Sequence, residues 1–147
     1  MRRFPTGVAV VTAAGAHGPA GLTTNAFSSL SLEPPLIVVC FDRGSRTLPV
    51  VRESRRFAVN VLRSDQRDLA RVFASKRVAA EKFAAVTHTV DHGVPVLDGA
   101  LAWLVCDLVA LHPGGDHELG IGAVTALGHD AEGEPLVFYG GAYRDLA

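Results

Sequence analysis

Short apolar runs alternate with turn-forming residues along the whole chain, a pattern typical of a mainly β protein. The runs are rich in Val, Leu, Thr and Phe and are bounded by turns such as AHGP, EPP and HPGGD. They predict strands over residues 7–14, 20–29, 36–41, 56–62, 86–90, 100–112, 118–128 and 136–139. We expect these strands to close into a β-barrel, because closure removes exposed sheet edges.

Two short helices are predicted between the strands. Ser45 can cap the first, which carries Leu48, and Asp65 can cap the second, in QRDLARVFA, where apolar positions recur at helical spacing. The sequence contains no repeats, low-complexity tracts or linkers, and its 147 residues match the size of one domain. We therefore expect a single domain over residues 1–147.

Residues 100–111 are apolar at nearly every position instead of alternating. A strand of this kind is covered on both faces. The barrel interior would cover one face, and a second copy of the chain is the simplest cover for the other. The pattern therefore predicts a two-fold symmetric homodimer.

Charge and composition exclude several classes of partner. The chain has 14 basic and 15 acidic side chains, a net charge of −1, which provides no electrostatic footprint for nucleic acid or an anionic membrane. No segment approaches the roughly 18 apolar residues of a transmembrane helix. The N-terminal run is interrupted by Pro5, Thr6 and Gly7, which favours a strand over a signal peptide. Cys40 and Cys106 lie in separate apolar runs, as reduced core cysteines do, so we expect a cytoplasmic protein.

The sequence contains the first residues of two common motifs, but it lacks the residues that would complete them. The GIG at residues 120–122 starts like a dinucleotide fingerprint, but Thr125 occupies the third glycine position. His117 starts like a zincin motif, but no second histidine follows at the required spacing. His88 and His92 fall in a strand pattern that separates them by about 13 Å. We predict no metal site.

A polar segment, LTTNAFSSLSLEPPL, lies at residues 22–36. Its hydroxyls and amide can bind a neutral, heteroatom-rich ligand, although a solvated strand face fits the pattern equally well. If the strand is continuous, one face carries Thr23, Asn25, Phe27, Ser29 and Ser31, and the other carries Thr24, Ala26, Ser28 and Leu30.

Two further segments are suited to an anion. Of the 14 basic residues 12 are arginine, and the two lysines, Lys76 and Lys82, both fall in VFASKRVAAEKF beside Ser75. Lysine is a compact charge suited to phosphate, but the segment is also compatible with a solvated loop. FDRGSRT enters a helix at Ser45, where a helix N-terminus can bind an anion or Ser45 can act only as a cap.

The segment HPGGDHELGIGAV combines glycines, which let a ligand approach the backbone closely, with a histidine. Asp116 precedes His117 and can orient its ring. Taken alone, the pattern favours a hairpin turn with an exposed histidine.

Several blocks of the chain, in their order and spacing, resemble the flavin reductase family, which has the FMN-binding split-barrel fold. The blocks are FPTGVAVVT, GLTTNAFSSLSLEPPLIVVCFD, SRT, FASK, EKF, GDHELGIGAV and PLVFYGGAYRDL. These proteins are the reductase components of two-component flavin-dependent monooxygenases. Family members usually carry a short helical segment before FPTGV, so the resemblance implies a truncated N-terminus or an alternative start.

The resemblance implies a homodimeric, Greek-key split β-barrel with two or three short helices that uses NADH or NADPH to reduce FMN or FAD. The reduced flavin would pass to a partner monooxygenase. Two alternatives stay open within the same fold. One is an oxidoreductase that retains FMN and passes electrons to another acceptor, and the other is a non-catalytic flavin-binding protein.

The resemblance also assigns a cofactor site, residue by residue. Those implied along the isoalloxazine edge are Thr23, Thr24, Asn25 and Ala26, with Ser29 farther along the flavin. Those implied around the flavin tail and its phosphate are Cys40, Phe41, Asp42, Ser45, Thr47, Ser75 and Lys76, with Lys82 and Phe83 close by. His117 is implied as the catalytic residue that contacts the nicotinamide nucleotide, and Tyr143 would close the site near the ring.

Overall fold

The computed structural model describes residues 1–146, and it confirms a mainly β fold with short helices. The strands are β1 Thr6–Gly7, β2 Ala9–Gly15, β3 Gly18–Thr24, β4 Phe27–Ser31, β5 Leu36–Asp42, β6 Arg56–Val61, β7 His88–Asp91, β8 Val94–Leu97, β9 Ala102–Gly114, β10 His117–His129, β11 Val137–Tyr139 and β12 Ala142–Arg144. The helices are α1 Thr47–Ser54, α2 Arg67–Ala74 and α3 Ala79–Ala84, with a 3₁₀ turn at Ser64–Gln66.

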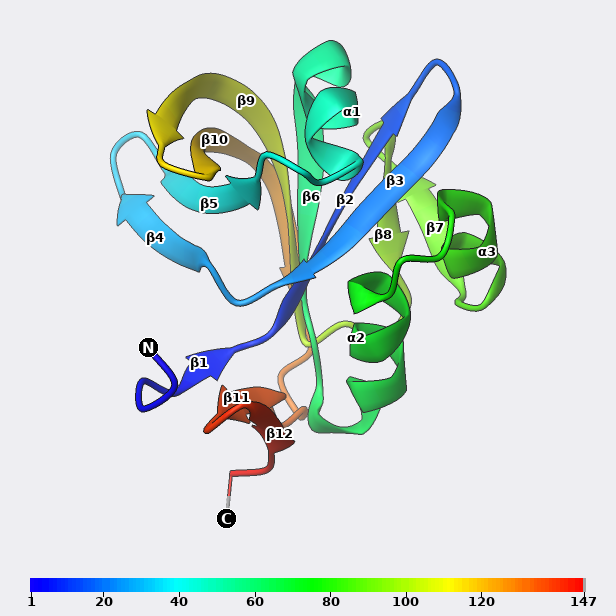
Figure 1. Ribbon diagram of the computed structural model, residues 1–147, viewed down its shortest axis with the longest axis vertical. Coiled ribbons are helices and arrows are strands. Elements are labelled where there is room, and N and C mark those ends of the chain that lie inside the picture. Colours follow the sequence, from blue (N-terminus) through cyan, green and yellow to red (C-terminus); the bar gives the residue numbers. More distant parts are fainter. Residues whose placement is uncertain (147) are drawn as a thin grey trace.

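Seven strands form one antiparallel sheet in the order β3-β2-β6-β9-β10-β5-β4. The sheet curls into an open barrel, with β4, β5, β9 and β10 on one side and β2, β3 and β6 on the other (Figure 1). Its two edge strands, β3 and β4, follow each other in the chain but do not pair. The barrel is therefore split between them, as the family resemblance implies.

An apolar core fills the barrel beneath helix α1. The rings of Phe41 and Phe57 meet edge to face with centroids 5.9 Å apart. Leu48 and Val51 of α1 are fully buried against the same cluster. Helix α1 therefore closes one end of the barrel, and its position follows from the apolar residues that the sequence places at helical spacing.

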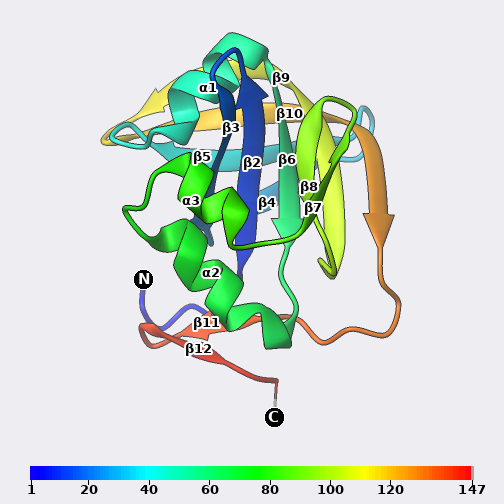
Figure 2. The same cartoon turned by 90° about the vertical axis from the view of Figure 1, so that its right-hand side faces the viewer.

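Helices α2 and α3 form a second apolar cluster outside the barrel, beside β3 (Figure 2). Phe73 of α2 and Phe83 of α3 pack edge to face, with ring centroids 5.1 Å apart. The small β11-β12 hairpin joins this cluster through Phe138 and Tyr143. These contacts fix the end of α2, and with it the loop that follows.

The β7-β8 hairpin is attached to β2 and β6 through a buried amide. Asn60 donates to the Val10 carbonyl at 3.0 Å and accepts from the Leu97 backbone N–H at 2.9 Å. Thr12, also buried, donates to the Pro95 carbonyl. Both the oxygen and the nitrogen of the Asn60 amide thus have hydrogen-bond partners, so this polar group can be buried without a large desolvation cost.

Several local predictions need correction. The predicted strand 20–29 breaks after Thr24, where the Ala26 N–H donates to the Thr24 hydroxyl and turns the chain. Asp65 does not cap α2, because a 3₁₀ turn precedes that helix and Gln66 accepts from the Arg63 N–H.

The segment after α2 also differs from the prediction. It contains α3, and the predicted strand 86–90 becomes the β7-β8 hairpin, starting at His88. His92 lies in the hairpin turn with a φ of 52°, so it does not share a strand face with His88.

The two cysteines have different environments, although both are free thiols. Cys106 is fully buried, and burial together with the charge of Asp107 raises the pKa of its thiol to about 12. Cys40 is half-buried. Cys106 is thus the inert core thiol that the sequence predicts, whereas Cys40 lies nearer the surface.

The longest helices of residues 1–146, α1 and α2, have eight residues each. Within that range no helix has the length and apolar character required to cross a membrane.

Candidate active site

A cleft of ≈ 1070 Å³ runs along β3, with α1 on one side and the α2–α3 segment on the other. It brings together most of the residues that the sequence assigned to a cofactor. Those that line it are Thr23, Thr24, Asn25, Ala26, Cys40, Asp42, Ser45, Thr47, Ser75, Lys76, Lys82 and His117.

One wall of the cleft is the link between the edge strands β3 and β4. The Ala26 carbonyl accepts from the Cys40 N–H at 2.9 Å, which ties this link to β5. Thr23 donates to the Ala70 carbonyl of α2 at 2.7 Å. Asn25 lies exposed at the turn. Thr23, Thr24, Asn25 and Ala26 all line the cleft around this break in the strand.

The start of α1 presents groups to the cleft that are suited to an anion. The Ser45 hydroxyl accepts from the backbone N–H groups of Thr47 at 3.0 Å and Leu48 at 3.3 Å, so Ser45 does cap this helix. Its own O–H can still donate to a ligand. Arg46, which follows it, is exposed on the same wall. The helix N-terminus and this guanidinium both favour a negative group.

The loop after α2 faces this helix start across the cleft. Arg46 donates to the carbonyls of Lys76 at 2.7 Å and Arg77 at 2.9 Å. Ser75 donates to the Val72 carbonyl at 2.6 Å, closing the end of α2. The loop is thus held through its backbone carbonyls, and the Lys76 side chain is exposed.

Lys82 has a different role from Lys76. Its side chain is buried, and its ammonium donates to the carbonyls of Phe73 at 3.0 Å and Gly21 at 3.3 Å. Burial, together with the nearby Arg46 charge, lowers the pKa of Lys82 from its ordinary value. Two of its three protons are used within the fold. Lys82 therefore joins β3 to the end of α2 and forms the wall of the cleft.

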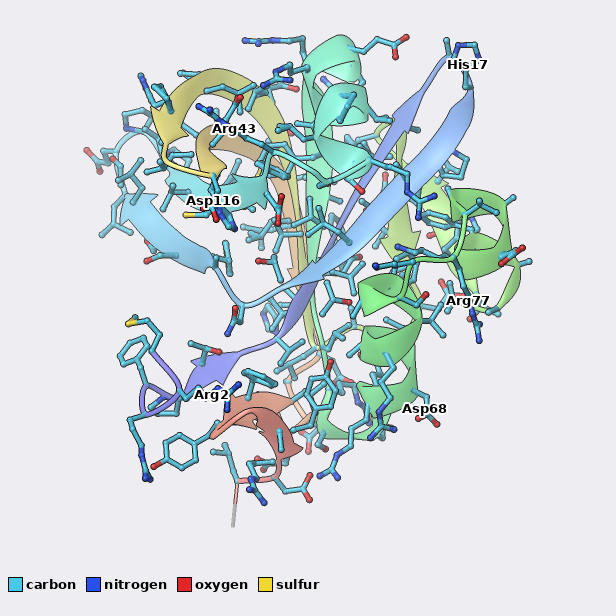
Figure 3. All side chains as sticks on the ribbon, in the orientation of Figure 1. Arg2, His17, Arg43, Asp68, Arg77 and Asp116 are labelled. Atoms are coloured by element: carbon cyan, nitrogen blue, oxygen red, sulfur yellow. The ribbon has the colours of Figure 1, made fainter. Side chains whose placement is uncertain are left out.

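His117 lies at the end of the cleft opposite the β2-β3 hairpin, beside the β5 terminus. It is paired with Asp42 of β5 in the sheet register, and its Nδ1 lies 2.7 Å from an Asp116 carboxylate oxygen. That hydrogen bond holds the pKa of Asp116 below its usual range. The Arg43 N–H donates to the Asp116 carbonyl at 3.0 Å, and both residues lie together in Figure 3.

Glu118 anchors the hairpin that carries His117. Its carboxylate is only 15% exposed and forms ion pairs with Arg52 of α1 and Arg43. The hairpin is thereby held against the β5–α1 segment, which places His117 on the lining of the cleft.

Four predicted site residues lie outside the cleft. Phe41 alternates with Cys40 and Asp42 along β5, so it points into the barrel core instead. The other three are Ser29, which is exposed on β4, Phe83, which packs on Phe73, and Tyr143, which packs on Phe138 and under the Arg71 guanidinium.

Comparisons with known proteins agree with this geometry. The chain matches the Flavin reductase like domain over residues 1–147. The chain belongs to the flavin reductase family. It is 40% identical to an NADH-dependent flavin reductase from Rhodococcus sp, covering 99% of this chain and 82% of that protein.

Two other known proteins are similar over nearly the whole chain. HsaB of Mycobacterium tuberculosis, the reductase subunit of a flavin-dependent monooxygenase, is 38% identical, covering 99% of this chain and 79% of that protein. A solved NADH:FAD oxidoreductase from Streptomyces globisporus, in complex with NAD and FAD fragments, is 37% identical with a TM-score of 0.93, covering 99% of this chain and 87% of that one.

The cleft fits the flavin that the flavin reductase family implies. Its volume suits a ligand of that size, and hydroxyl and amide groups at the strand link suit a heteroatom-rich ring. The cationic loop at Lys76 and the start of α1 suit a phosphate. Within residues 1–146 no group of three or more His, Cys, Asp or Glu residues could hold a metal ion.

Sequence reasoning left some cleft residues unassigned. Arg46 was visible, since it lies between Ser45 and Thr47 in SRT. His17 and Glu53 also line the cleft, but they come from a hairpin turn and from α1, elements that meet only in the folded chain.

Asn25→Ala is expected to weaken flavin binding about fivefold, because it removes one neutral hydrogen-bonding side chain from the cleft, worth about 1 kcal/mol. Titration of flavin fluorescence measures the loss. Asn25→Asp, of nearly the same shape, is the matched comparison. An unchanged affinity in Asn25→Ala would remove this side chain from the site.

Proposed function

We propose that this chain is an NAD(P)H-dependent flavin reductase, which reduces FMN or FAD and releases the reduced flavin to a partner monooxygenase. The observation that carries the proposal is the meeting of three features in one cleft. These are the polar β3–β4 link, the anion-binding loop at Lys76, and His117 at the end of the β9-β10 hairpin. The family membership supports the same activity.

The bound nicotinamide and flavin supply the hydride-transfer chemistry themselves, so the protein contributes binding, orientation and electrostatics. The Asn25 amide and the Thr24 hydroxyl, whose oxygen already accepts from Ala26, are hydrogen-bond donors at the strand link. Donors at the ring edge stabilise the negative charge that reduction places there. Since they are neutral, flavin affinity stays modest and the product can leave.

Ser45, Thr47, Ser75 and Lys76 border the part of the cleft where we place the flavin phosphate. Arg46 holds the backbone of that loop through two carbonyls. His117, oriented by Asp116, would contact the nicotinamide nucleotide. The phosphate and the nucleotide are thereby assigned to different residues of the same cleft.

The deciding experiment is NADH oxidation by the purified chain with and without added flavin. We expect NADH oxidation that depends on added FMN or FAD. The same assay with NADPH in place of NADH compares the two electron donors. Activity with co-purified flavin alone would support the oxidoreductase that retains FMN. The absence of activity in every combination would support the non-catalytic flavin-binding protein.

His117→Ala is expected to raise the apparent KM for NADH about fivefold while flavin affinity stays within a factor of about two, since one polar contact to the nucleotide is lost. Steady-state kinetics at saturating flavin measure the first effect and flavin titration the second. His112→Ala, exposed on the same hairpin but outside the cleft, is the control. Unaltered kinetics would remove His117 from the site.

We propose that the functional unit is a homodimer of single-domain chains. Large apolar side chains are exposed on three strands of one half of the sheet, at Leu30 of β4, Val109 of β9 and Leu127 of β10. A second copy would remove them from water. Light scattering at micromolar concentration should give twice the 15.5 kDa chain mass, and the mass of a single chain would contradict the proposal.

We place this activity in the cytoplasm. The two cysteines, Cys40 and Cys106, are both free thiols, which is usual for a reducing compartment.

A further inference from the structure

We propose that a second cavity of the chain, separate from the cleft, binds a small organic carboxylate. Its volume of ≈ 430 Å³ lies within the size range of small-molecule sites. It lies between the end of α1, the start of β6, the β7-β8 turn and the middle of β9, and it shares no lining residue with the cleft. Figure 2 shows β6 beside the β7-β8 hairpin on this side of the molecule. The proposal goes beyond flavin reduction and does not depend on it.

Two of the side chains on the lining of this cavity come from backbone positions that favour glycine. Arg55, which follows α1, has a φ of 58°, and His92, in the β7-β8 turn, has a φ of 52°. They are the two non-glycine residues with a positive φ in the part of the chain that the structure describes. Glycine or asparagine usually occupies such positions at helix ends and in tight hairpin turns, and other residues there cost free energy. Because both strained residues border one cavity, a use for their side chains is indicated.

Arg55 supplies the positive charge for a carboxylate. One amino group of its guanidinium donates to the Leu108 carbonyl at 3.0 Å, which holds the planar group against β9. Within residues 1–146 no carboxylate forms an ion pair with Arg55. The remaining N–H groups can bind a carboxylate in the bidentate manner typical of arginine.

The neighbouring charges fit a carboxylate better than a phosphate. Arg56 donates from Nε to the Asp107 carboxylate at 2.8 Å and from a terminal amino group to the His92 carbonyl at 3.0 Å. Arg56 and Asp107 thus neutralise each other, and the charge of Arg55 is left for a ligand. One such charge matches one carboxylate, whereas the Asp107 carboxylate would repel a doubly charged phosphate.

The rest of the lining suits a short, partly apolar ligand. Ala14 and Leu108 supply apolar surface. The His92 Nδ1 lies 2.5 Å from an Asp91 carboxylate oxygen, so Nε2 is the ring nitrogen left for a ligand. Asp107, whose side chain is 47% exposed, can accept from a hydroxyl group of the ligand. A small aliphatic carboxylate, with or without a hydroxyl group, therefore matches the cavity.

The test is titration of the isotope-labelled full chain with sodium butyrate, without flavin or NADH, followed by the NMR shifts of backbone amides. Saturable shifts are expected at residues 54–56, 92–93 and 107–108, with a dissociation constant in the millimolar range. Arg55→Gln should weaken this binding about tenfold, because the charge-assisted pair is lost. Arg55→Gly, which suits the backbone at that position, should weaken it equally while the spectrum elsewhere stays that of the wild type. Arg144→Gln, which removes an exposed cation outside both cavities, is the control.

Three results would overturn the proposal. The first is an absence of saturable shifts at these residues, and the second is unchanged binding in both Arg55 variants. The third is a set of butyrate shifts confined to Ser45, Thr47 and Ser75, which would place the anion in the cleft instead. A parallel titration with inorganic phosphate should give weaker binding at the cavity, and tighter binding of phosphate there would reject the assignment to a carboxylate. None of these results bears on NADH oxidation, so the proposed flavin reductase activity is tested separately.

Discussion

Lys76→Ala should weaken FMN binding by about tenfold to a hundredfold and leave riboflavin binding nearly unchanged, because only FMN has a phosphate. A hydrogen bond to a charged partner contributes about 1.5–3 kcal/mol, which corresponds to that range. Lys76 is exposed on the wall of the cleft, and the loop that carries it is held by the Arg46 bonds to backbone carbonyls. The variant therefore loses the charge but keeps the loop.

Fluorescence titrations with FMN and riboflavin measure this difference directly. Lys76→Arg should retain most of the FMN affinity, and Arg144→Ala, an exposed cation outside the cleft, should bind both flavins like the wild type. Added salt should weaken FMN binding more than riboflavin binding in the wild type, and less so in Lys76→Ala. Equal losses for FMN and riboflavin in Lys76→Ala would reject the phosphate assignment.

Both lysines of the chain fall in one segment, which predicts an anion site there, but their environments in the structure differ. Lys76 faces the cleft, whereas Lys82 is buried and bonded to the Gly21 and Phe73 carbonyls. Residue type alone therefore does not distinguish the two lysines. The turn between α2 and α3 leaves Lys76 exposed at the cleft, where it is a candidate for binding phosphate, and lets Lys82 bond to backbone carbonyls of β3 and α2.

The main strands were predictable because each is an apolar run between turn formers. The small elements were not, since β8, β12 and α3 have only three to six residues each and depend on contacts made elsewhere. The β7-β8 hairpin, for example, is fixed by Asn60, which accepts from the Leu97 N–H. Such long-range contacts leave no periodic signal in the sequence.

The candidate site also has residues that the sequence predicts and residues that it does not. The polar pattern of residues such as Thr24 and Asn25 fits a ligand site and a solvated strand face equally well, and the family resemblance assigns these residues to the flavin. The alternation expected across 20–29 fails because the Thr24 hydroxyl accepts from the Ala26 N–H and breaks the strand. Tyr143 matches a family block in sequence but lies with Phe138 and Arg71, outside the cleft of this chain.

Gly21→Ala should lower the free energy of unfolding by about 3 kcal/mol and weaken flavin binding about tenfold or more, the upper range for overpacking in a core. A Cβ atom at Gly21 would lie 2.7 and 2.8 Å from two carbons of the Phe73 ring and 3.3 Å from the Val11 carbonyl oxygen. Phe73 is 1% exposed and packs on Phe83, so its ring has no free space to enter.

Helix α2 must therefore move away from β3 in the variant. The Lys82 ammonium bonds both the Gly21 and Phe73 carbonyls, and the shift would strain both contacts. The loop at Ser75 follows the end of α2 directly, so the phosphate region moves with the helix. Stability and flavin affinity are thus expected to fall together, although Gly21 presents no side chain to a ligand.

Denaturant unfolding and flavin titration measure the two effects. Gly7→Ala is the control, since a Cβ there would have nothing within 4 Å. Phe73→Leu introduced with Gly21→Ala should recover part of both losses, because the smaller side chain makes room for the added methyl group. If Gly21→Ala matched the wild type in stability and affinity, the close contact between β3 and α2 would not set the shape of the cleft. Rescue by Phe73→Leu would instead show that this contact positions the loop that follows α2.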